Sequence, residues 1–168
     1  MNGEHSEFPN LLAEGNALED AGQYAAARQR YEAAARLEPT SPRPLLNAGN
    51  AFAREGSLPD AVAVTRRAVA LAPAFAPAHY NLGLLLQRAG DADEAERALR
   101  TALRLDPTFA DAAVALANQL QGNGQAHAAC ALLERALAAS PAHAGVACAL
   151  GIACLERDEL DQAETLLA

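Results

Sequence analysis

Hydrophobic and polar positions recur with helical spacing through residues 76–109, APAHYNLGLLLQRAGDADEAERALRTALRLDPTF. Two stripes repeat at intervals of three and four residues, which is the spacing of one helix face. The stripes are His79, Leu82 and Leu86, then Ala95, Leu99, Ala102 and Leu105. Gly90 interrupts the pattern between them, and Pro107 lacks an amide hydrogen and cannot extend the second helix. The segment is therefore predicted to form two helices joined by a tight turn.

The same pattern returns at a constant interval along the chain. A proline follows the second helix of each pair, at the evenly spaced positions Pro39, Pro73, Pro107 and Pro141, and such a fixed period indicates internal repeats. We predict repeats at residues 8–41, 42–75, 76–109, 110–143 and 144–168, the last one incomplete, after an N-terminal tail of residues 1–7. Pro73 closes one helix pair, and Pro77 falls in the first turn of the next helix, where proline is tolerated.

Small residues occupy fixed slots in these repeats. One slot holds Gly15, Gly49, Gly83, Ala117 and Gly151, and another, twelve residues later, holds Ala27, Ala61, Ala95, Ala129 and Ala163. We expect the two helices of each pair to cross there, so that a leucine would cost about 1–3 kcal/mol by overpacking. The turn slot holds Gly22, Gly56, Gly90 and Gly124, with Asp158 in the last repeat. These residues favour a left-handed turn, which aspartate tolerates less well than glycine.

With these residues the chain resembles the tetratricopeptide repeat family. The matching residues of the third repeat are Leu82, Gly83, Gly90, Ala95, Leu99, Ala102 and Pro107, and the resemblance covers residues 8–168. It implies an all-α fold, a right-handed α-solenoid of stacked antiparallel helix pairs. In this family the first helix of each pair lines a concave groove, so the resemblance also implies a scaffold that binds a peptide or protein partner there.

Ten residues on the first helices are the candidate groove residues. They are Asn16, Arg43, Asn47, Asn50, Arg54, Tyr80, Asn81, Leu84, Arg88 and Asn118. Because asparagine both donates and accepts, a row of asparagines can bracket the amides of an extended peptide. The alternative is that these asparagines bond to neighbouring helices and only stabilise the stack.

Arginines occupy equivalent slots of adjacent pairs. Arg54 and Arg88 are one repeat apart, which places them roughly 10 Å apart by helix packing distances. With Arg43 they would make the middle of the groove basic and suited to an acidic or phosphorylated segment, since arginine makes bidentate contacts with carboxylate and phosphate. The alternative is solvated arginines with local Glu or Asp partners.

One subtype implied by the resemblance is excluded. Chaperone-adaptor members grip a C-terminal carboxylate with lysines, an arginine and two asparagines. Asn16 and Asn47 match those asparagines, but Leu12, Pro77 and Asn81 stand where the cations belong, and the chain contains no lysine.

Composition and charge narrow the function classes. Alanine, the best helix former, accounts for 44 of 168 residues, while aromatic residues make up 4%. The net charge of −8 disfavours nucleic acid and anionic membranes, which attract basic surfaces. No apolar run reaches the roughly 18 residues of a membrane span, and the N-terminus lacks the features of a signal peptide. We therefore expect a cytoplasmic protein.

No constellation of residues points to catalysis, a cofactor or a metal. Cys130, Cys148 and Cys154 are expected to be free thiols, and the histidines His5, His79, His127 and His143 are scattered along the chain. His79 occupies a core slot, which favours packing over ligation. We predict that the chain is not an enzyme and has no cofactor.

Two functions remain open. The first is an interaction scaffold for a peptide or protein. The second is a substrate-recruiting arm of a larger enzyme, because the pattern is similar to the region that precedes the catalytic part of O-GlcNAc-type glycosyltransferases. Related bacterial chains place such repeats before sulfotransferase, methyltransferase or hydroxylase domains. The fifth repeat stops at Ala168 without a polar cap, so we expect a longer protein, or self-association through this C-terminal edge.

Overall fold

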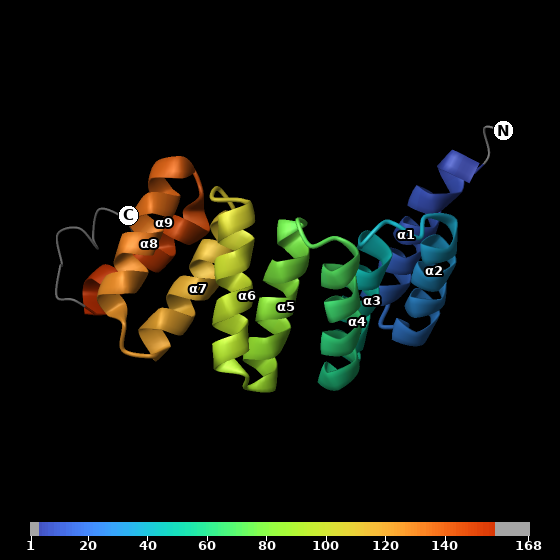
Figure 1. Ribbon diagram of the computed structural model, residues 1–168, viewed down its shortest axis with the longest axis horizontal. Coiled ribbons are helices and arrows are strands. Elements are labelled where there is room, and N and C mark those ends of the chain that lie inside the picture. Colours follow the sequence, from blue (N-terminus) through green and yellow to red (C-terminus); the bar gives the residue numbers. More distant parts are fainter. Residues whose placement is uncertain (1–3, 157–168) are drawn as a thin grey trace. The chain divides into compact units, whose positions relative to one another are not determined.

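The computed structural model describes residues 4–156, which form helices joined by short turns (Figure 1). The described helices are α1 (Glu4–Asp20), α2 (Tyr24–Leu37), α3 (Arg43–Glu55), α4 (Leu58–Leu71), α5 (Ala76–Ala89), α6 (Ala92–Leu105), α7 (Ala110–Gly122), α8 (Ala126–Ala139) and α9 (Ala144–Glu156). No strand occurs among these residues, so the predicted all-α class is confirmed.

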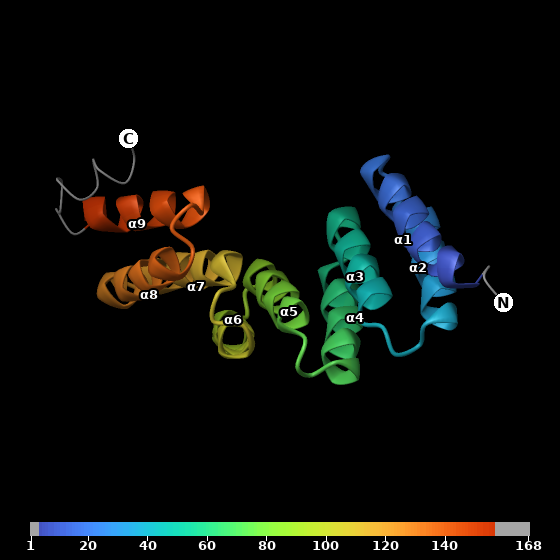
Figure 2. The same ribbon diagram turned by 90° about the horizontal axis from the view of Figure 1, so that it is seen from above.

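The helices form two compact units, residues 1–91 and 92–168. In the first unit α1 packs on α2, α2 on α3, α3 on α4 and α4 on α5, and α3 also touches both α1 and α5. In the second unit α6 packs on α7, α7 on α8 and α8 on α9, and α7 also touches α9. Figure 2 shows the paired helices of each unit from above. In the first unit α1, α3 and α5 therefore share one layer, and they carry most of the candidate groove residues.

Left-handed glycines make the turns inside four of the helix pairs. Gly22, Gly56, Gly90 and Gly124 have φ values of 75°, 96°, 85° and 74°. A side chain is strained in this region of φ, whereas glycine adopts it freely. The prediction for the four glycine turns is thus confirmed, and Asp158 lies outside the described residues.

The prolines stand where the second helices end. Pro73 follows α4, which ends at Leu71, and Pro77 lies in the first turn of α5, as predicted. The start of α1 differs from expectation, because this helix begins at Glu4 rather than at residue 8 and contains Pro9. Pro9 is the sixth residue of this helix and donates no backbone hydrogen bond there, yet the helix continues through it to Asp20.

The small residues lie where helices approach closely. The alanines Ala27, Ala61, Ala95, Ala117 and Ala129 are fully buried, whereas Ala163 lies outside the described residues. A Cβ on Gly15 would overlap the ring of Tyr31, and a Cβ on Gly49 would overlap Oγ1 of Thr65. The crossing prediction is confirmed at these two glycines, and the partner across the crossing differs between the first pair and the second.

Replacing Gly15 by alanine is expected to destabilise the first unit. The new methyl group meets Tyr31, which is 1% exposed and cannot move into solvent. Overpacking costs about 1–3 kcal/mol, which exceeds the gain of about 0.5–1 kcal/mol that alanine brings to a helix. Urea unfolding followed by circular dichroism measures the change in the free energy of unfolding.

Gly122→Ala is the matched control. Outside the backbone of α7 itself, no atom lies within 4 Å of the added Cβ at Gly122, which ends α7 and is not among the glycines with positive φ. This variant should be unchanged or slightly more stable than the wild type. Equal stabilities of Gly15→Ala and Gly122→Ala would contradict the close crossing of α1 and α2.

Candidate functional site

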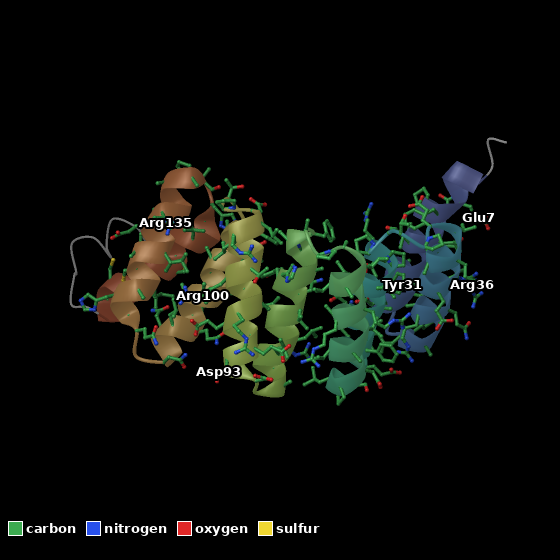
Figure 3. The ribbon with its side chains drawn as sticks, in the orientation of Figure 1. Glu7, Tyr31, Arg36, Asp93, Arg100 and Arg135 are labelled. Atoms are coloured by element: carbon green, nitrogen blue, oxygen red, sulfur yellow. The ribbon has the colours of Figure 1, made fainter. Side chains whose placement is uncertain are left out.

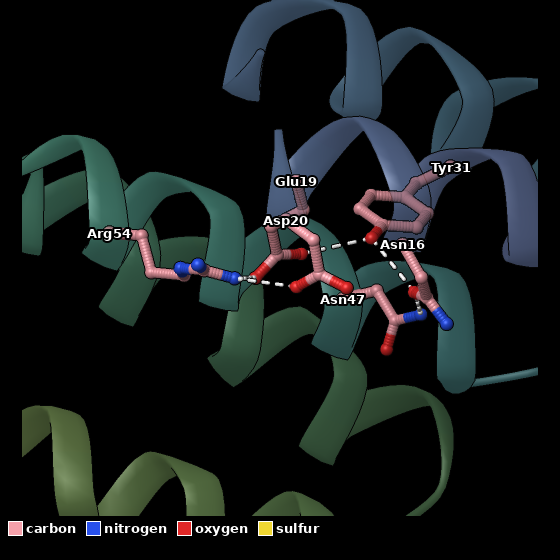
Figure 4. A network of polar contacts seen from close by, with 6 residues as sticks. All are labelled: Asn16, Glu19, Asp20, Tyr31, Asn47 and Arg54. Carbon is pink, nitrogen blue, oxygen red and sulfur yellow. Dashed lines mark hydrogen bonds and ion pairs between the residues drawn. The ribbon is translucent and has the colours of Figure 1, made fainter. Parts of the chain in front are cut away.

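A polar network joins α1, α2 and α3 in the first unit (Figure 4). Because Gly15 has no side chain, the ring of Tyr31 lies across α1 and its hydroxyl reaches two acceptors. The hydroxyl lies 2.9 Å from Oδ1 of Asn16 and 2.9 Å from Oε2 of Glu19, to either of which it can donate. Nδ2 of Asn47 donates to the same Asn16 oxygen at 3.0 Å. The network therefore fixes side chains of two first helices in one arrangement.

Arg54 of α3 completes this network. Its guanidinium donates to Oε1 of Glu19 at 3.2 Å and to Oδ1 of Asp20 at 3.3 Å, and it lies 5.8 Å from the ring centre of Tyr24. Hydrogen bonds to Glu19 and then to Asp20 raise the pKa of Arg54 above its already high value. Two carboxylates thus offset the charge of this arginine.

Tyr31 is the buried centre of the network. Burial raises the pKa of its hydroxyl far above the usual value, and the hydrogen bond to Glu19 and the negative charge of Glu19 raise it further. Glu19 is itself only 8% exposed. A buried carboxylate is stable only where hydrogen bonds or counter-charges replace water, and Tyr31 and Arg54 supply one partner to each of its oxygens.

Two open hollows lie along the layer of first helices. The α1–α3 hollow, of about 270 Å³, is lined by Asn16, Glu19, Asp20, Asn47 and Asn50. The α3–α5 hollow, of about 310 Å³, is lined by Glu19, Asn50, Ala53, Arg54, Asn81, Leu84, Leu85 and Arg88. Asn50 lines both hollows, so they adjoin each other along α3.

Hydrogen-bonding capacity is unused in the α3–α5 hollow. The amide side chains of Asn50 and Asn81 bond to no residue in the described part of the chain. Arg88 donates to the carbonyl oxygen of Ala53 at 3.0 Å. Beside these groups lie Leu84 and Leu85, so polar and apolar surfaces meet in one place.

Seven of the ten candidate groove residues line these two hollows. They are Asn16, Asn47, Asn50, Arg54, Asn81, Leu84 and Arg88. Arg43 is exposed at the start of α3, and Tyr80 is half-buried on α5. Asn118 is exposed on α7 of the second unit.

The contacts separate the candidates into two groups. Asn16 and Asn47 bond to each other across α1 and α3, as in the alternative of asparagines that stabilise the stack. Arg54 pairs with local carboxylates, which was the alternative to a basic groove. Asn50 and Asn81 have no such partner among the described residues and remain available to a ligand.

Tyr31 was missed because it belongs to a second helix. The sequence did contain an indication of its role, in one slot of the first helix and one slot of the second helix compared together. These slots hold Gly15 and Tyr31 in the first repeat but Ala117 and Leu133 in the fourth. A glycine opposite a tyrosine indicates a ring packed on backbone, and the hydroxyl of such a buried ring needs a partner.

In the second unit, His143 caps the start of α9. Its Nδ1 accepts from the amide of Val146 at 3.2 Å, and its Nε2 lies 3.5 Å from Oδ1 of Asp111. The imidazole therefore carries its hydrogen on Nε2, facing the carboxylate. This arrangement joins α7 to α9.

Neither a metal site nor a membrane span occurs in the part that the structure describes. No three His, Cys, Asp or Glu side chains of residues 4–156 are grouped so that they could hold a metal ion. None of the helices within these residues has both the length and the apolar character needed to cross a bilayer.

Family models match three segments of the chain. A model of the tetratricopeptide repeat matches residues 12–74, and another matches residues 144–168. The model described as the cilia and flagella-associated protein 70 middle TPR-like domain matches residues 65–150, about half of the chain. No curated protein matches the sequence significantly.

Several solved structures share the fold. PilF of Pseudomonas aeruginosa has a TM-score of 0.85 at 18% identity, over 98% of this chain and 75% of that one. MamA of Desulfovibrio magneticus RS-1 has a TM-score of 0.74 at 22% identity, over 96% and 91%. YrrB, described as a TPR protein with an unusual peptide-binding site, has a TM-score of 0.67 at 18% identity, over 94% and 81%. These likenesses confirm the predicted solenoid of helix pairs.

Replacing Tyr31 by phenylalanine is expected to lower stability and to change its dependence on pH. The loss of the single hydroxyl donor that faces the charged Glu19 and Asn16 should cost about 1.5–3 kcal/mol at pH 7. In the wild type the raised pKa of Tyr31 means that the unfolded chain loses this proton first, near pH 10. The stability linked to Tyr31 is therefore complete below pH 10 and falls as the pH rises further.

Urea unfolding at pH 7, 9, 10 and 11 tests this expectation. The chain has no lysine, and its three cysteines and two other tyrosines are the same in both proteins, so the difference between the two curves isolates Tyr31. The wild type should lose up to about 1.4 kcal/mol per pH unit through Tyr31, and Tyr31→Phe should lack this component. Parallel curves for the two proteins would contradict the buried Tyr31–Glu19 contact.

Proposed function

Because this chain belongs to the tetratricopeptide repeat family, whose fold is a scaffold for protein interactions, we propose that its first unit binds an extended peptide segment of a partner protein. The peptide would lie along α3 and α5, over the α3–α5 hollow, with α1 at one end. The observation that carries this proposal is the pair of amide side chains, Asn50 and Asn81, that have no partner among the described residues.

Asparagine suits the backbone of an extended peptide. Its oxygen accepts from a peptide N–H and its NH₂ group donates to a peptide carbonyl. Asn50 and Asn81 stand on neighbouring first helices and line the same hollow. They can therefore engage successive parts of one backbone without reading its side chains.

The charges around the hollow favour a peptide without strong net charge. Arg54 and Arg88 line it, but Glu19 lines it as well, and Asp20 pairs with Arg54. These four formal charges sum to zero, so an acidic or phosphorylated segment gains little here. Leu84, which is only partly buried, instead offers contact to one apolar side chain of the peptide.

The remaining candidates extend the proposal beyond this hollow. Asn16 and Asn47 keep one unused amide group each, Nδ2 and Oδ1 respectively, at the edge of the α1–α3 hollow. Arg43, Tyr80 and Asn118 stay predicted groove residues. The description of YrrB as a peptide-binding TPR protein supports a peptide as the class of ligand.

The second function, a substrate-recruiting arm of a larger enzyme, stays a prediction that no contact in the described part of the chain favours. It depends on what the full reading frame encodes after Ala168. The proposed scaffold performs no catalysis of its own.

Asn50→Ala/Asn81→Ala is expected to weaken peptide binding without unfolding the chain. Peptides of twelve residues are selected from a phage-displayed random library on the wild type, and their affinities are measured by fluorescence anisotropy. Loss of two peptide hydrogen bonds, each worth about 0.5–1.5 kcal/mol, should raise Kd by about 5- to 150-fold.

Asn10→Ala is the control, because Asn10 is an exposed asparagine of α1 that lines neither hollow. It should bind the selected peptides as the wild type does. Peptides whose affinity is the same for the wild type and the double variant would move the binding surface away from the α3–α5 hollow.

A further inference from the structure

The first unit has another hollow, on the other side of α3. This arginine hollow has a volume of about 300 Å³ and is lined by Arg28, Tyr31, Glu32, Ala35, Arg36, Pro44, Leu45, Ala48, Phe52, Val64 and Arg67, from α2, α3 and α4. Its α3 residues 45, 48 and 52 stand two positions before groove residues 47, 50 and 54. Two residues correspond to about 200° around a helix, so the two surfaces face nearly opposite directions.

The floor of the arginine hollow is apolar. Leu45, Ala48 and Phe52 lie three and four residues apart on one face of α3, and Val64 adds to them from α4. All four side chains are only partly buried. Phe52 is also the only aromatic residue in its slot, because the other repeats hold leucine or cysteine there.

Three arginines surround this floor, and they differ in how far their guanidinium groups are paired within the protein. Arg28 is used internally, since it pairs with Glu55 at 2.5 Å and stacks 4.2 Å from the ring centre of Phe52. Arg36 projects outward from α2 (Figure 3), is 78% exposed and approaches Glu32 only at 3.8 Å. Arg67 has no ion pair or hydrogen bond to any residue in the described part.

The repeat fold itself does not require these arginines. The equivalent positions of the next repeat, one period after Arg28, Arg36 and Arg67, hold a valine, an alanine and a threonine. Helices of the same length form there without a cation. Two repeats later the slots of Arg36 and Arg67 hold arginine again, at Arg104 and Arg135, but the slot of Arg28 holds a glutamate and that of Phe52 a leucine. The combination of these three arginines with an aromatic ring therefore occurs once, in a chain whose net charge is −8.

We propose that the arginine hollow binds an acidic segment of a partner protein, independently of the groove. One bulky apolar side chain of the segment covers Leu45, Phe52 and Val64, and carboxylates next to it pair with Arg36 and Arg67. The volume of 300 Å³ is at the lower end of small-molecule pockets, roughly 300–1,000 Å³, so it suits one or two side chains. Arginine binds carboxylate in a bidentate manner, which adds orientation to the charge complementarity.

The probe is the fluorescein-labelled peptide Gly-Ser-Leu-Asp-Phe-Asp-Ser-Gly. We expect it to bind the wild type, and to bind Arg36→Glu/Arg67→Glu at least about tenfold more weakly, because charge reversal turns two attractions into repulsions. Two control peptides test the two parts of the contact: one has lysine in place of both aspartates, and the other has serine in place of leucine and phenylalanine. Each should bind the wild type at least about tenfold more weakly than the probe does. The methyl resonances of Leu45 and Val64 should shift on titration.

Arg97→Glu/Arg135→Glu is the matched control protein. It makes the same change of net charge at two exposed arginines of second helices in the other unit, for which no ion pair is formed in the described part. This variant and Asn50→Ala/Asn81→Ala should bind the probe as the wild type does. Circular dichroism establishes that all variants keep their helices.

Four results would overturn the proposal. The first is that the probe does not bind the wild type at about 1 mM, and the second is that Arg36→Glu/Arg67→Glu binds the probe as tightly as the wild type does. The third is that both charge-reversal variants lose the same amount of affinity for the probe. The fourth is that only the asparagine variant loses affinity, which would place the peptide in the groove. A fifth is a concentration-dependent dimer of the wild type that Arg36→Glu/Arg67→Glu abolishes, because the occupant is then a second copy of the chain.

Discussion

The close crossing of helices at glycine and alanine is the constraint on which the rest of the first unit depends. At Gly15 the missing Cβ makes room for the ring of Tyr31, which then lies against the backbone of α1. That position brings the tyrosine hydroxyl to Asn16 and Glu19, and the other oxygen of Glu19 holds Arg54. One absent methyl group therefore determines the placement of charges on two neighbouring helices.

The burial of Glu19 explains why the groove is less basic than its arginines suggest. A carboxylate that is 8% exposed must keep its partners, because their removal leaves a buried charge uncompensated. Arg54 is thus committed to a structural contact, which was one of the two alternatives that its position in the repeat left open. What remains for a ligand is the neutral chemistry of Asn50 and Asn81 and the apolar surface of Leu84.

The fold was predictable from the sequence because it depends on backbone requirements that recur. Positive φ at Gly22 or Gly56 and the missing amide hydrogen of Pro73 act within a few residues, so their spacing alone placed the turns and helix ends. Whether each candidate site residue is hydrogen-bonded within the protein or free to bind a ligand was less predictable. Whether an asparagine such as Asn47 is bonded or free depends on side chains of other helices, which the period of the repeat does not specify.

The groove and the arginine hollow, on opposite faces of α3, also differ in how their residues recur from repeat to repeat. The slot of Asn50 holds asparagine in three of the first four repeats and leucine in the third, so the groove repeats a common chemistry. The slots of Arg36 and Arg67 hold arginine again two repeats later, but Phe52 is the only aromatic residue in its slot, so the combination of arginines with an aromatic floor occurs at one position in the chain. A surface that repeats suits a long backbone whose groups repeat as well, whereas a surface found once suits a short segment with one arrangement of charges. The two surfaces are joined through α3 and through Tyr31, which lines the arginine hollow and bonds Asn16 and Glu19 of the groove. Asn50, Asn81, Arg36 and Arg67 take no part in that contact, so substitutions at these positions leave the contacts of the other surface in place.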